Sequence, residues 1–297
     1  MSVPGTIARI AGLGPAPRPV GVPQGLGRRL LAHRAFQVGL GCLAAVVLLA
    51  AAGPLLARDP AATDYANQLA APSWEHWLGT DHAGRDSFAR TVAGAYNSLG
   101  AALLVFTIST LVGLLLGAAA GLLGGVFDLV LNRFVDILLG LPSLVLSLAV
   151  IGALGPGFGT LILAMCLTEW ARLAKLARAH TLGSAQRPEV IAARMAGAGP
   201  LRAAVGHVLP GTVVQVLIAA TLNLGEIVLF LASLSFLGLG AQPPAAEWGN
   251  MIAESRASYA VAPWLLIGPG LGIVLCIAGA TLISDALRDC TDPAGRL

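Results

Sequence analysis

The residue types that could do chemistry are few and scattered along this sequence. It has a single lysine, Lys175, and this lysine does not follow a glycine. A phosphate-binding P-loop requires Gly-Lys-Ser/Thr, because its lysine must reach the bound phosphates. The patterns H-E-x-x-H and G-x-S-x-G, typical of metalloproteases and serine hydrolases, do not occur either. We therefore predict that the chain is not an enzyme and does not hydrolyse ATP by itself.

One group of residues has the types that bind transition metals. His76 and His82 share a predicted loop with Glu75 and Asp81. Imidazole and carboxylate groups are both common ligands of such metals. A solvated polar loop explains the same four residues better, so no metal site is assigned. The four cysteines are widely spaced and predict neither a zinc site nor a disulfide framework.

The segments around these residues are those of a membrane protein. Of the 297 residues, 56% are hydrophobic and only 11% are charged, whereas soluble domains carry about 25% charged residues. About 20 apolar residues span a bilayer as a helix, because backbone groups must bond internally in lipid. We predict an all-α fold with six transmembrane helices, at residues 35–57, 97–123, 130–154, 157–178, 207–236 and 262–285. Glu169 interrupts the fourth predicted span. The first span is longer than the apolar region of a secretory signal and begins later in the sequence, so we predict that it is retained as a membrane helix.

The placement of basic residues predicts the orientation. Of the 18 lysines and arginines, 14 fall in segments that are cytosolic if the N-terminus is cytosolic, which follows the positive-inside rule. We predict that both termini are cytosolic, and the bias removes any need for a nucleic-acid partner. The predicted organisation is a disordered basic tail (1–34), a first transmembrane helix (35–57), an external loop (58–95), a five-helix core (96–286) and a cytosolic tail (287–297).

A basic hairpin, residues 179–206, interrupts the apolar segments of the core. Pro188 suits the first turn of a short helix, and Gly197 can end it. Ala192 and Ala193 keep this helix thin, so that it can lie close to another surface. The hairpin is therefore either a segment that docks into a groove of a partner protein or an ordinary cytosolic loop.

The same hairpin resembles a motif of the permease subunits of ABC importers. That motif is Glu-Ala-Ala, three residues, Gly, nine residues, Ile, one residue, Leu-Pro. The matching residues here are Ala192, Ala193, Gly197, Leu209 and Pro210. Ile191 and His207 stand where Glu and Ile are usual. The stretches HWLGTDHAGRDSFARTVAGAYNSL, RFVDILLGLPSLVL, LSFLGLGAQPPAAEWGNMI and DALRDCTDP are similar to the second permease subunit of the peptide/nickel branch.

This resemblance implies the type I permease fold in the inner membrane and a set of partners. These are a homologous permease, two cytosolic ATPases that bind ATP and magnesium, and an external substrate-binding protein, with no cofactor on this chain. It also implies that the hairpin couples to an ATPase. The coupling residues would be Ala192, Ala193, Arg194, Gly197, Ala198, Leu209 and Pro210. The family motif of the external loop corresponds to Gly79, Thr80, Asp81, Gly84, Arg85 and Asp86.

Three polar residues inside the predicted spans are candidates for the translocation pathway: Asp136, Asn223 and Glu226. Ionisable groups within membrane spans usually face a cavity or one another. Asn223 and Glu226 lie three residues apart and share a helix face. A contact between helices explains Glu226 equally well, and Arg133 can pair locally with Asp136.

One position in the fifth predicted span bears on the cargo. Peptide permeases usually carry a glutamate where this chain has Leu231, and its absence favours nickel or a small metal chelate. Import of di- or oligopeptides is the alternative, and a secondary transporter is a distant third because no internal repeat is visible. In the outer segment 238–263, Glu247, Glu254 and Arg256 are expected to contact the binding protein or substrate, or to pack against the second permease.

Overall fold

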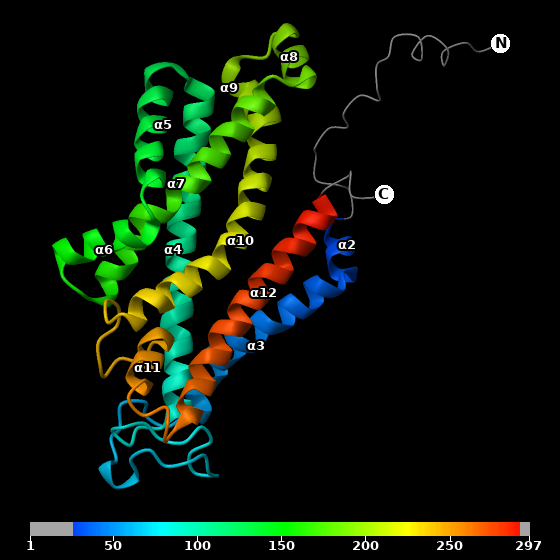
Figure 1. Ribbon diagram of the computed structural model, residues 1–297. Coiled ribbons are helices and arrows are strands. Elements are labelled where there is room, and N and C mark those ends of the chain that lie inside the picture. Colours follow the sequence, from blue (N-terminus) through cyan, green and yellow to red (C-terminus); the bar gives the residue numbers. More distant parts are fainter. Residues whose placement is uncertain (1–25, 292–297) are drawn as a thin grey trace.

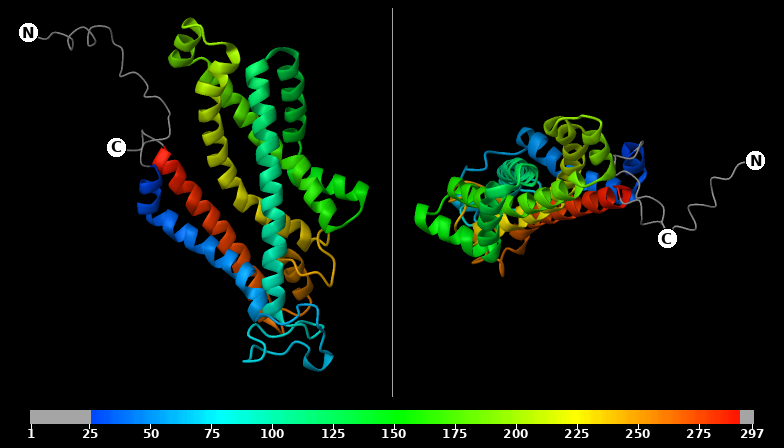
Figure 2. Two further views of the ribbon diagram at one scale, coloured as in Figure 1. Left: turned by 180° about the vertical axis from the view of Figure 1, so that it is seen from behind. Right: turned by 90° about the horizontal axis from the view of Figure 1, so that it is seen from above.

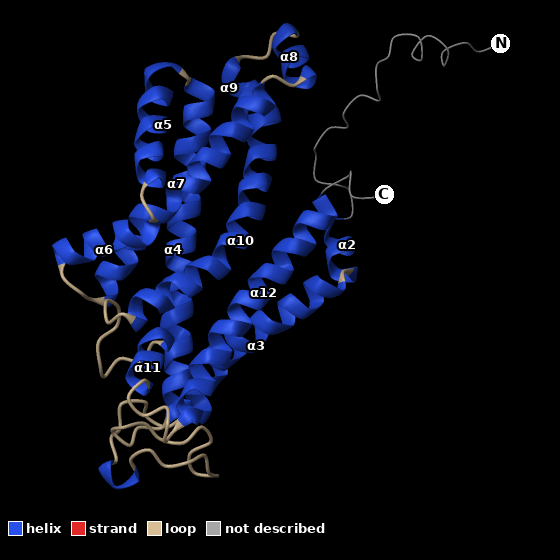
Figure 3. Cartoon of the chain, in the orientation of Figure 1, coloured by secondary structure: helices blue, strands red, loops and turns tan. Residues whose placement is uncertain are grey.

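The structure, a computed structural model, describes residues 26–291, and its regular elements in that range are helices (Figure 3). The long helices are α3 (Arg34–Leu56), α4 (Ser87–Leu123), α5 (Gly125–Gly140), α6 (Ser143–Leu154), α7 (Phe158–Ala185), α10 (Leu209–Phe236) and α12 (Ile267–Thr291). The short ones are α2 (Leu26–Ala32), η1 (Tyr65–Asn67), α8 (Pro188–Met195), α9 (Pro200–Ala203), the π-helix η2 (Ala204–Val208), α11 (Trp248–Ser255) and η3 (Pro263–Leu266). This confirms the all-α prediction for the described residues.

The long helix α4 forms the centre of the bundle, with α7 and α10 along it and α3 paired with α12 beside them (Figures 1 and 2). Small residues allow α4 and α7 to approach closely. A Cβ atom added at Gly117 would lie 2.2 Å from the carbonyl oxygen of Ala174. Gly113 and Gly121, one turn away on either side, face α7 in the same way. Small residues at four-residue intervals promote the association of membrane helices through close packing, because the hydrophobic effect does not drive association within lipid.

Four helical segments are long and apolar enough to cross a membrane: Arg34–Gly53, Ser87–Leu123, Pro200–Phe236 and Pro263–Thr291. The predicted third span is instead a broken pair, α5 and α6, bent by 93°. Pro142 lies at this break, where it cannot continue α5. Helix α7 is not among the candidates, because it carries four charged residues, Glu169, Arg172, Lys175 and Arg178, within ten positions. The six predicted spans are thus supported for four helices, or five with the bent pair.

Three predicted boundaries differ from the structure. The tail predicted to be disordered contains a helix, α2, which packs against α12. Residues 1–25 of that tail lie outside the described range. The loop predicted to end at residue 95 ends at Asp86, whose carboxylate accepts a hydrogen bond from Ala89 N (2.7 Å) and starts α4. Helix α12 continues to Thr291, beyond the predicted start of the C-terminal tail, and residues 292–297 are not described.

The two ends of the bundle are built differently. The hairpin of α8 and α9 projects at one end, here called the hairpin end (Figure 1). Residues 57–86 and α11 lie together at the opposite end, the loop end. The two sets of residues singled out by motif in the sequence therefore lie at opposite ends of the molecule.

Candidate functional site: a loop-end network, a charged ladder and a hairpin

The loop that carries the motif Gly-Thr-Asp is fastened tightly at the loop end. Thr80 pairs with Asp86 in an isolated β-bridge, and its hydroxyl accepts a hydrogen bond from Ala70 N (2.8 Å). Gly84 has φ of +72°, and a Cβ atom there would lie 1.7 Å from the carbonyl oxygen of Asp64. Gly79, with φ of +69°, is equally constrained. The positive φ angles and the close neighbours both require glycine at these two positions. These two residues of the motif therefore shape the loop itself.

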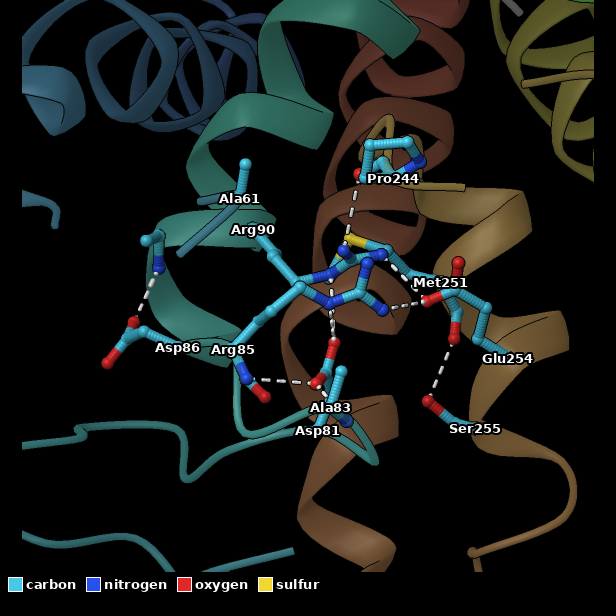
Figure 4. A network of polar contacts seen from close by, with 12 residues as sticks. Ala61, Asp81, Ala83, Arg85, Asp86, Arg90, Pro244, Met251, Glu254 and Ser255 are labelled. Atoms are coloured by element: carbon cyan, nitrogen blue, oxygen red, sulfur yellow. Dashed lines mark hydrogen bonds and ion pairs between the residues drawn. The ribbon is translucent and has the colours of Figure 1, made fainter. Parts of the chain in front are cut away.

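Four charged side chains close this loop onto the bundle (Figure 4). Arg85 Nε lies 2.7 Å from Asp81 Oδ2, and Arg85 Nη2 lies 3.1 Å from Glu254 Oε2. Arg90 reaches the same two carboxylates, with Nη2 at 2.7 Å from Glu254 and Nε at 3.4 Å from Asp81. All four side chains are buried or nearly so. Two acids and two arginines thus neutralise one another and join the loop, α4 and α11.

This network also decides the metal question raised by the sequence. Ligand atoms of Asp81, His82 and Glu254 lie within 4.8 Å of one another, close enough to hold an ion. Both carboxylates are already bound by arginine, and the guanidinium charges oppose a cation beside them. His76 contacts Asp86 instead, with Nδ1 at 2.8 Å from Oδ2. The arrangement does not fit a metal site.

Glu247 is likewise a structural residue. It is fully buried, and its carboxylate accepts hydrogen bonds from Gly249 N and Asn250 N, both at 3.0 Å, at the start of α11. Ser98 of α4 donates a further bond to it at 3.0 Å. The prediction that Glu247 and Glu254 contact the binding protein or the substrate does not fit their burial within the chain.

A second group of charges runs along α7 as a ladder, defined by Arg172, Lys175 and Arg178. Arg172 Nη1 donates to Glu226 Oε2 of α10 at 2.6 Å, and Lys175 Nζ donates to Asp136 Oδ1 of α5 at 2.8 Å. Arg178 forms a two-pronged pair with Asp128 of α5, one bond measuring 2.7 Å. Helix α7 therefore carries three cations on successive turns, each paired with an acid of a neighbouring helix.

The ladder corrects the predicted partner of Asp136. The i, i+3 rule suggested Arg133, whereas Asp136 binds Lys175 and also accepts a bond of 3.4 Å from Asn132. Asn223 and Glu226 share a helix face, as predicted, and Arg172 forms a hydrogen bond with each of them. Sequence reasoning missed the three cations themselves. Their three-residue spacing inside a partly apolar helix was the available signal.

The hairpin has the local structure that its sequence predicts. Helix α8 begins at Pro188, and Gly197 follows its end with φ of +89°, a conformation that favours glycine. The hydrogen bond from Ala198 N to Ala193 O (3.0 Å) closes this end. At the base of the hairpin, burial and then the charge of Arg187 lower the pKa of His180. The hairpin is thus a fixed turn and not an unstructured loop.

The predicted coupling residues fall into two groups. Ala192, Ala193, Arg194, Gly197 and Ala198 lie on α8 and its turn. Leu209 and Pro210 begin α10, beyond the π-helix η2. On the hairpin, Val190 packs inward with Ala203 and Val208, while Met195 and Leu201 are 85% and 76% exposed. Large apolar side chains presented this far from the bundle are typical of an interaction surface.

Comparison with known proteins identifies the family of this fold. A family model described as "Binding-protein-dependent transport system inner membrane component" matches residues 113–296. The N-terminal TM domain of oligopeptide transport permease C matches residues 24–72. The chain belongs to the binding-protein-dependent permease family. This permease is therefore the membrane component of an ABC importer, whose ATPase activity lies on separate subunits.

Three similar permeases are named for three different cargoes. The nickel transport system permease protein of Escherichia coli (strain K12) is 39% identical over 238 residues, 80% of this chain and 86% of its own. The dipeptide transport system permease protein of Alkalihalophilus pseudofirmus is 36% identical over 267 residues, 90% of this chain and 88% of its own. The glutathione transport system permease protein of Escherichia coli O6:K15:H31 is 40% identical over 230 residues, covering 77% and 76%.

Proposed function

We propose that this permease forms one half of a translocation pathway, opened and closed by ATP hydrolysis on partner subunits. A homologous permease would supply the other half, two cytosolic ATPases would bind ATP and magnesium, and a binding protein would deliver cargo at the loop end. The chain itself would bind no cofactor. In this arrangement both termini and the hairpin face the cytosol.

The exposed hairpin is the observation that carries this proposal. Its apolar residues Met195 and Leu201 are presented to the surroundings at one end of the bundle, beside the exposed Arg194 and Arg202. A short helix with apolar anchors and basic neighbours suits a groove on a soluble partner. Because the hairpin connects α7 to α10, movement of such a partner would pass directly into the membrane helices. Ile191, which stands where the motif has Glu, is half-exposed and would add an apolar contact instead of a charged one.

The pathway would run along the ladder of α7. Arg172 and Glu226 have side chains 57% and 65% exposed in the single chain. Charged groups at membrane depth are costly in lipid, so such residues face protein or water. We therefore propose that this face of α7 and α10 is turned toward the second permease and the cargo. Asp136 of α5 would line the pathway through its pair with Lys175, the next cation along α7.

Nickel or a small metal chelate is the proposed cargo. Glu226 and Asn223 offer oxygen atoms, which bind nickel weakly compared with imidazole, and weak binding suits a pathway that must release its cargo. High affinity would then reside in the binding protein. The nickel permease of Escherichia coli is among the relatives.

A short peptide is the second candidate, and one observation favours it. Arg172 and Glu226 present a cation and an anion side by side, which matches the two charges of a zwitterion better than a bare metal ion. The dipeptide permease named above is similar to this chain over more of its length than the nickel permease is.

The substitution Glu226→Gln tests the cargo in the assembled importer. It keeps the shape of the side chain and removes its charge. For a cationic cargo, uptake of radioactive nickel should fall severalfold while expression and basal ATP hydrolysis stay normal, and Asp289→Asn, an exposed acid at the end of α12, is the matched control. Unchanged nickel uptake in Glu226→Gln would remove the Glu226 charge from the pathway, whereas uptake of labelled dialanine and no nickel by the wild-type complex would assign the permease to peptides.

A further inference from the structure

Two acids lie near one arginine between α7 and α10. Arg172 Nη1 donates to Glu226 Oε2 (2.6 Å) and to Asn223 Oδ1 (3.1 Å). Glu169, one turn before Arg172 on α7, lies near the same three side chains. Four polar groups, two from each helix, thus meet where α7 crosses α10, and only one of them is a cation.

The two acids differ in their surroundings. The Glu169 residue is 8% exposed, whereas the Glu226 side chain is 65% exposed. Asn223 is buried as well, and its Nδ2 has no hydrogen-bond partner among the described residues. Glu169 is therefore an inner carboxylate and Glu226 an outer one. Both hydrogen bonds of Arg172 within the described chain use the same nitrogen, which leaves Nε and Nη2 for another acceptor.

Helix geometry keeps Glu169 within reach of Arg172 at all times. The two residues are three apart on one helix, with the acid on the N-terminal side, which is a favourable arrangement for an ion pair. The pair between Arg172 and Glu226 joins two helices and depends on their relative position. If α10 shifts against α7, Arg172 loses its outer partner and keeps its inner one.

The chain connects these helices so that they can shift. Helix α7 leads into α8, and α10 follows α9 through the π-helix η2. The hairpin therefore holds α7 and α10 by their ends, and its displacement changes their relative position. A π-helix has a wider turn than an α-helix and often marks a functional position, which places an adjustable segment at the start of α10.

We propose that Arg172 is an exchangeable counter-ion. It neutralises Glu226 in the conformation described here and passes to Glu169 when α10 shifts against α7. The exchange uncovers Glu226 for a cationic cargo without leaving the guanidinium unpaired at membrane depth, which would be costly. This inference rests on the proposed function, because it assigns the shift to the ATPase cycle.

Double-mutant cycles test the exchange without reference to any cargo. The assembled importer would carry Arg172→Met, Glu226→Gln and Glu169→Gln singly and in pairs, and its thermal unfolding would be measured without nucleotide and after trapping with ATP and vanadate. Arg172 should couple more strongly to Glu226 without nucleotide and more strongly to Glu169 in the trapped state. The neighbouring pair of Lys175 and Asp136 is the control, since Lys175 has no acid three or four residues before it. The same dominant partner for Arg172 in both states would overturn the proposal.

Uptake of radioactive nickel gives a second readout. Glu169→Gln should lower uptake severalfold when Glu226 is present and have no further effect in Glu226→Gln. Equal losses in both backgrounds would contradict the exchange. Arg172→Gln, which also removes the charge, replaces Arg172→Met in the cycles if the methionine variant fails to assemble. If the wild-type complex imports dialanine and no nickel, the proposed cargo is wrong, while the thermal cycles still decide the exchange.

Discussion

The loop-end network and the α7 ladder contain the same residue types and differ in burial and bonding. Arg90 is almost completely buried and contacts two carboxylates and a carbonyl oxygen. Lys175 and Arg172 are about half exposed, and each binds a single carboxylate. The loop-end charges therefore neutralise one another and hold the fold, whereas Arg172 and Lys175 of the ladder remain accessible in the single chain. A family motif rich in charged residues can thus mark structure.

The largest expected effect concerns the centre of the loop-end network. Arg90→Met should destabilise the permease by about 3–5 kcal/mol, because it leaves two buried carboxylates with a single cation. Little assembled complex should be recovered, and thermal unfolding of the remainder measures the loss. A melting temperature equal to that of the wild type would show that the network does not hold the loop end together.

Gly84→Ala should have the next largest effect. The new Cβ atom would lie 1.7 Å from Asp64 O at φ of +72°, which combines about 1–2 kcal/mol of backbone strain with about 1–3 kcal/mol of overpacking. Gly124→Ala is the matched control, since Gly124 has φ of +63° and no neighbour within 4 Å. It should show the strain alone. Equal shifts in melting temperature for the two variants would argue against close packing of the loop on Asp64.

The smallest effect on stability is expected in the ladder. Lys175→Met should change the free energy of unfolding by less than about 1 kcal/mol, because half-exposed ion pairs contribute little. Asp136→Asn should behave alike, and both are measured by thermal unfolding of the assembled importer. A loss as large as that of Arg90→Met would erase the distinction between the two regions.

The parts of this structure that follow local rules could be predicted from the sequence. The hairpin is fixed by Pro188 and Gly197, and the long apolar helices follow from hydropathy. Partners distant in sequence could not be predicted: Arg90 meets Glu254 across 164 residues, and Lys175 meets Asp136 across 39. Those pairs depend on how helices pack. The local rule for Asp136 favoured Arg133 and was wrong for that reason.

The same limit applies to the count of membrane spans. Helix α7 alternates buried small residues with the cations of the ladder, so its composition resembles neither a soluble nor a transmembrane helix. Its place in the bundle is set by contact with the glycines of α4, and no local pattern in α7 itself reports this contact.

The central claim is that the hairpin end does the work of coupling while the loop end holds the fold. Gly197 is a poor probe of this claim, because its φ of +89° would strain any substituted side chain. Met195 is a better one, since it is 85% exposed and supports nothing in the single chain. Met195→Asp can therefore change an interaction surface without affecting the fold, and Met195→Leu preserves the apolar contact as a control.

The decisive measurement is ATP hydrolysis by the assembled importer with and without its loaded binding protein, for the wild type, Met195→Asp and Met195→Leu. We expect Met195→Asp to keep the wild-type melting temperature and to lose stimulation by the binding protein, while Met195→Leu retains it. Full stimulation in the Met195→Asp complex would contradict the account, because the exposed hairpin would then not be the surface through which the ATPases act.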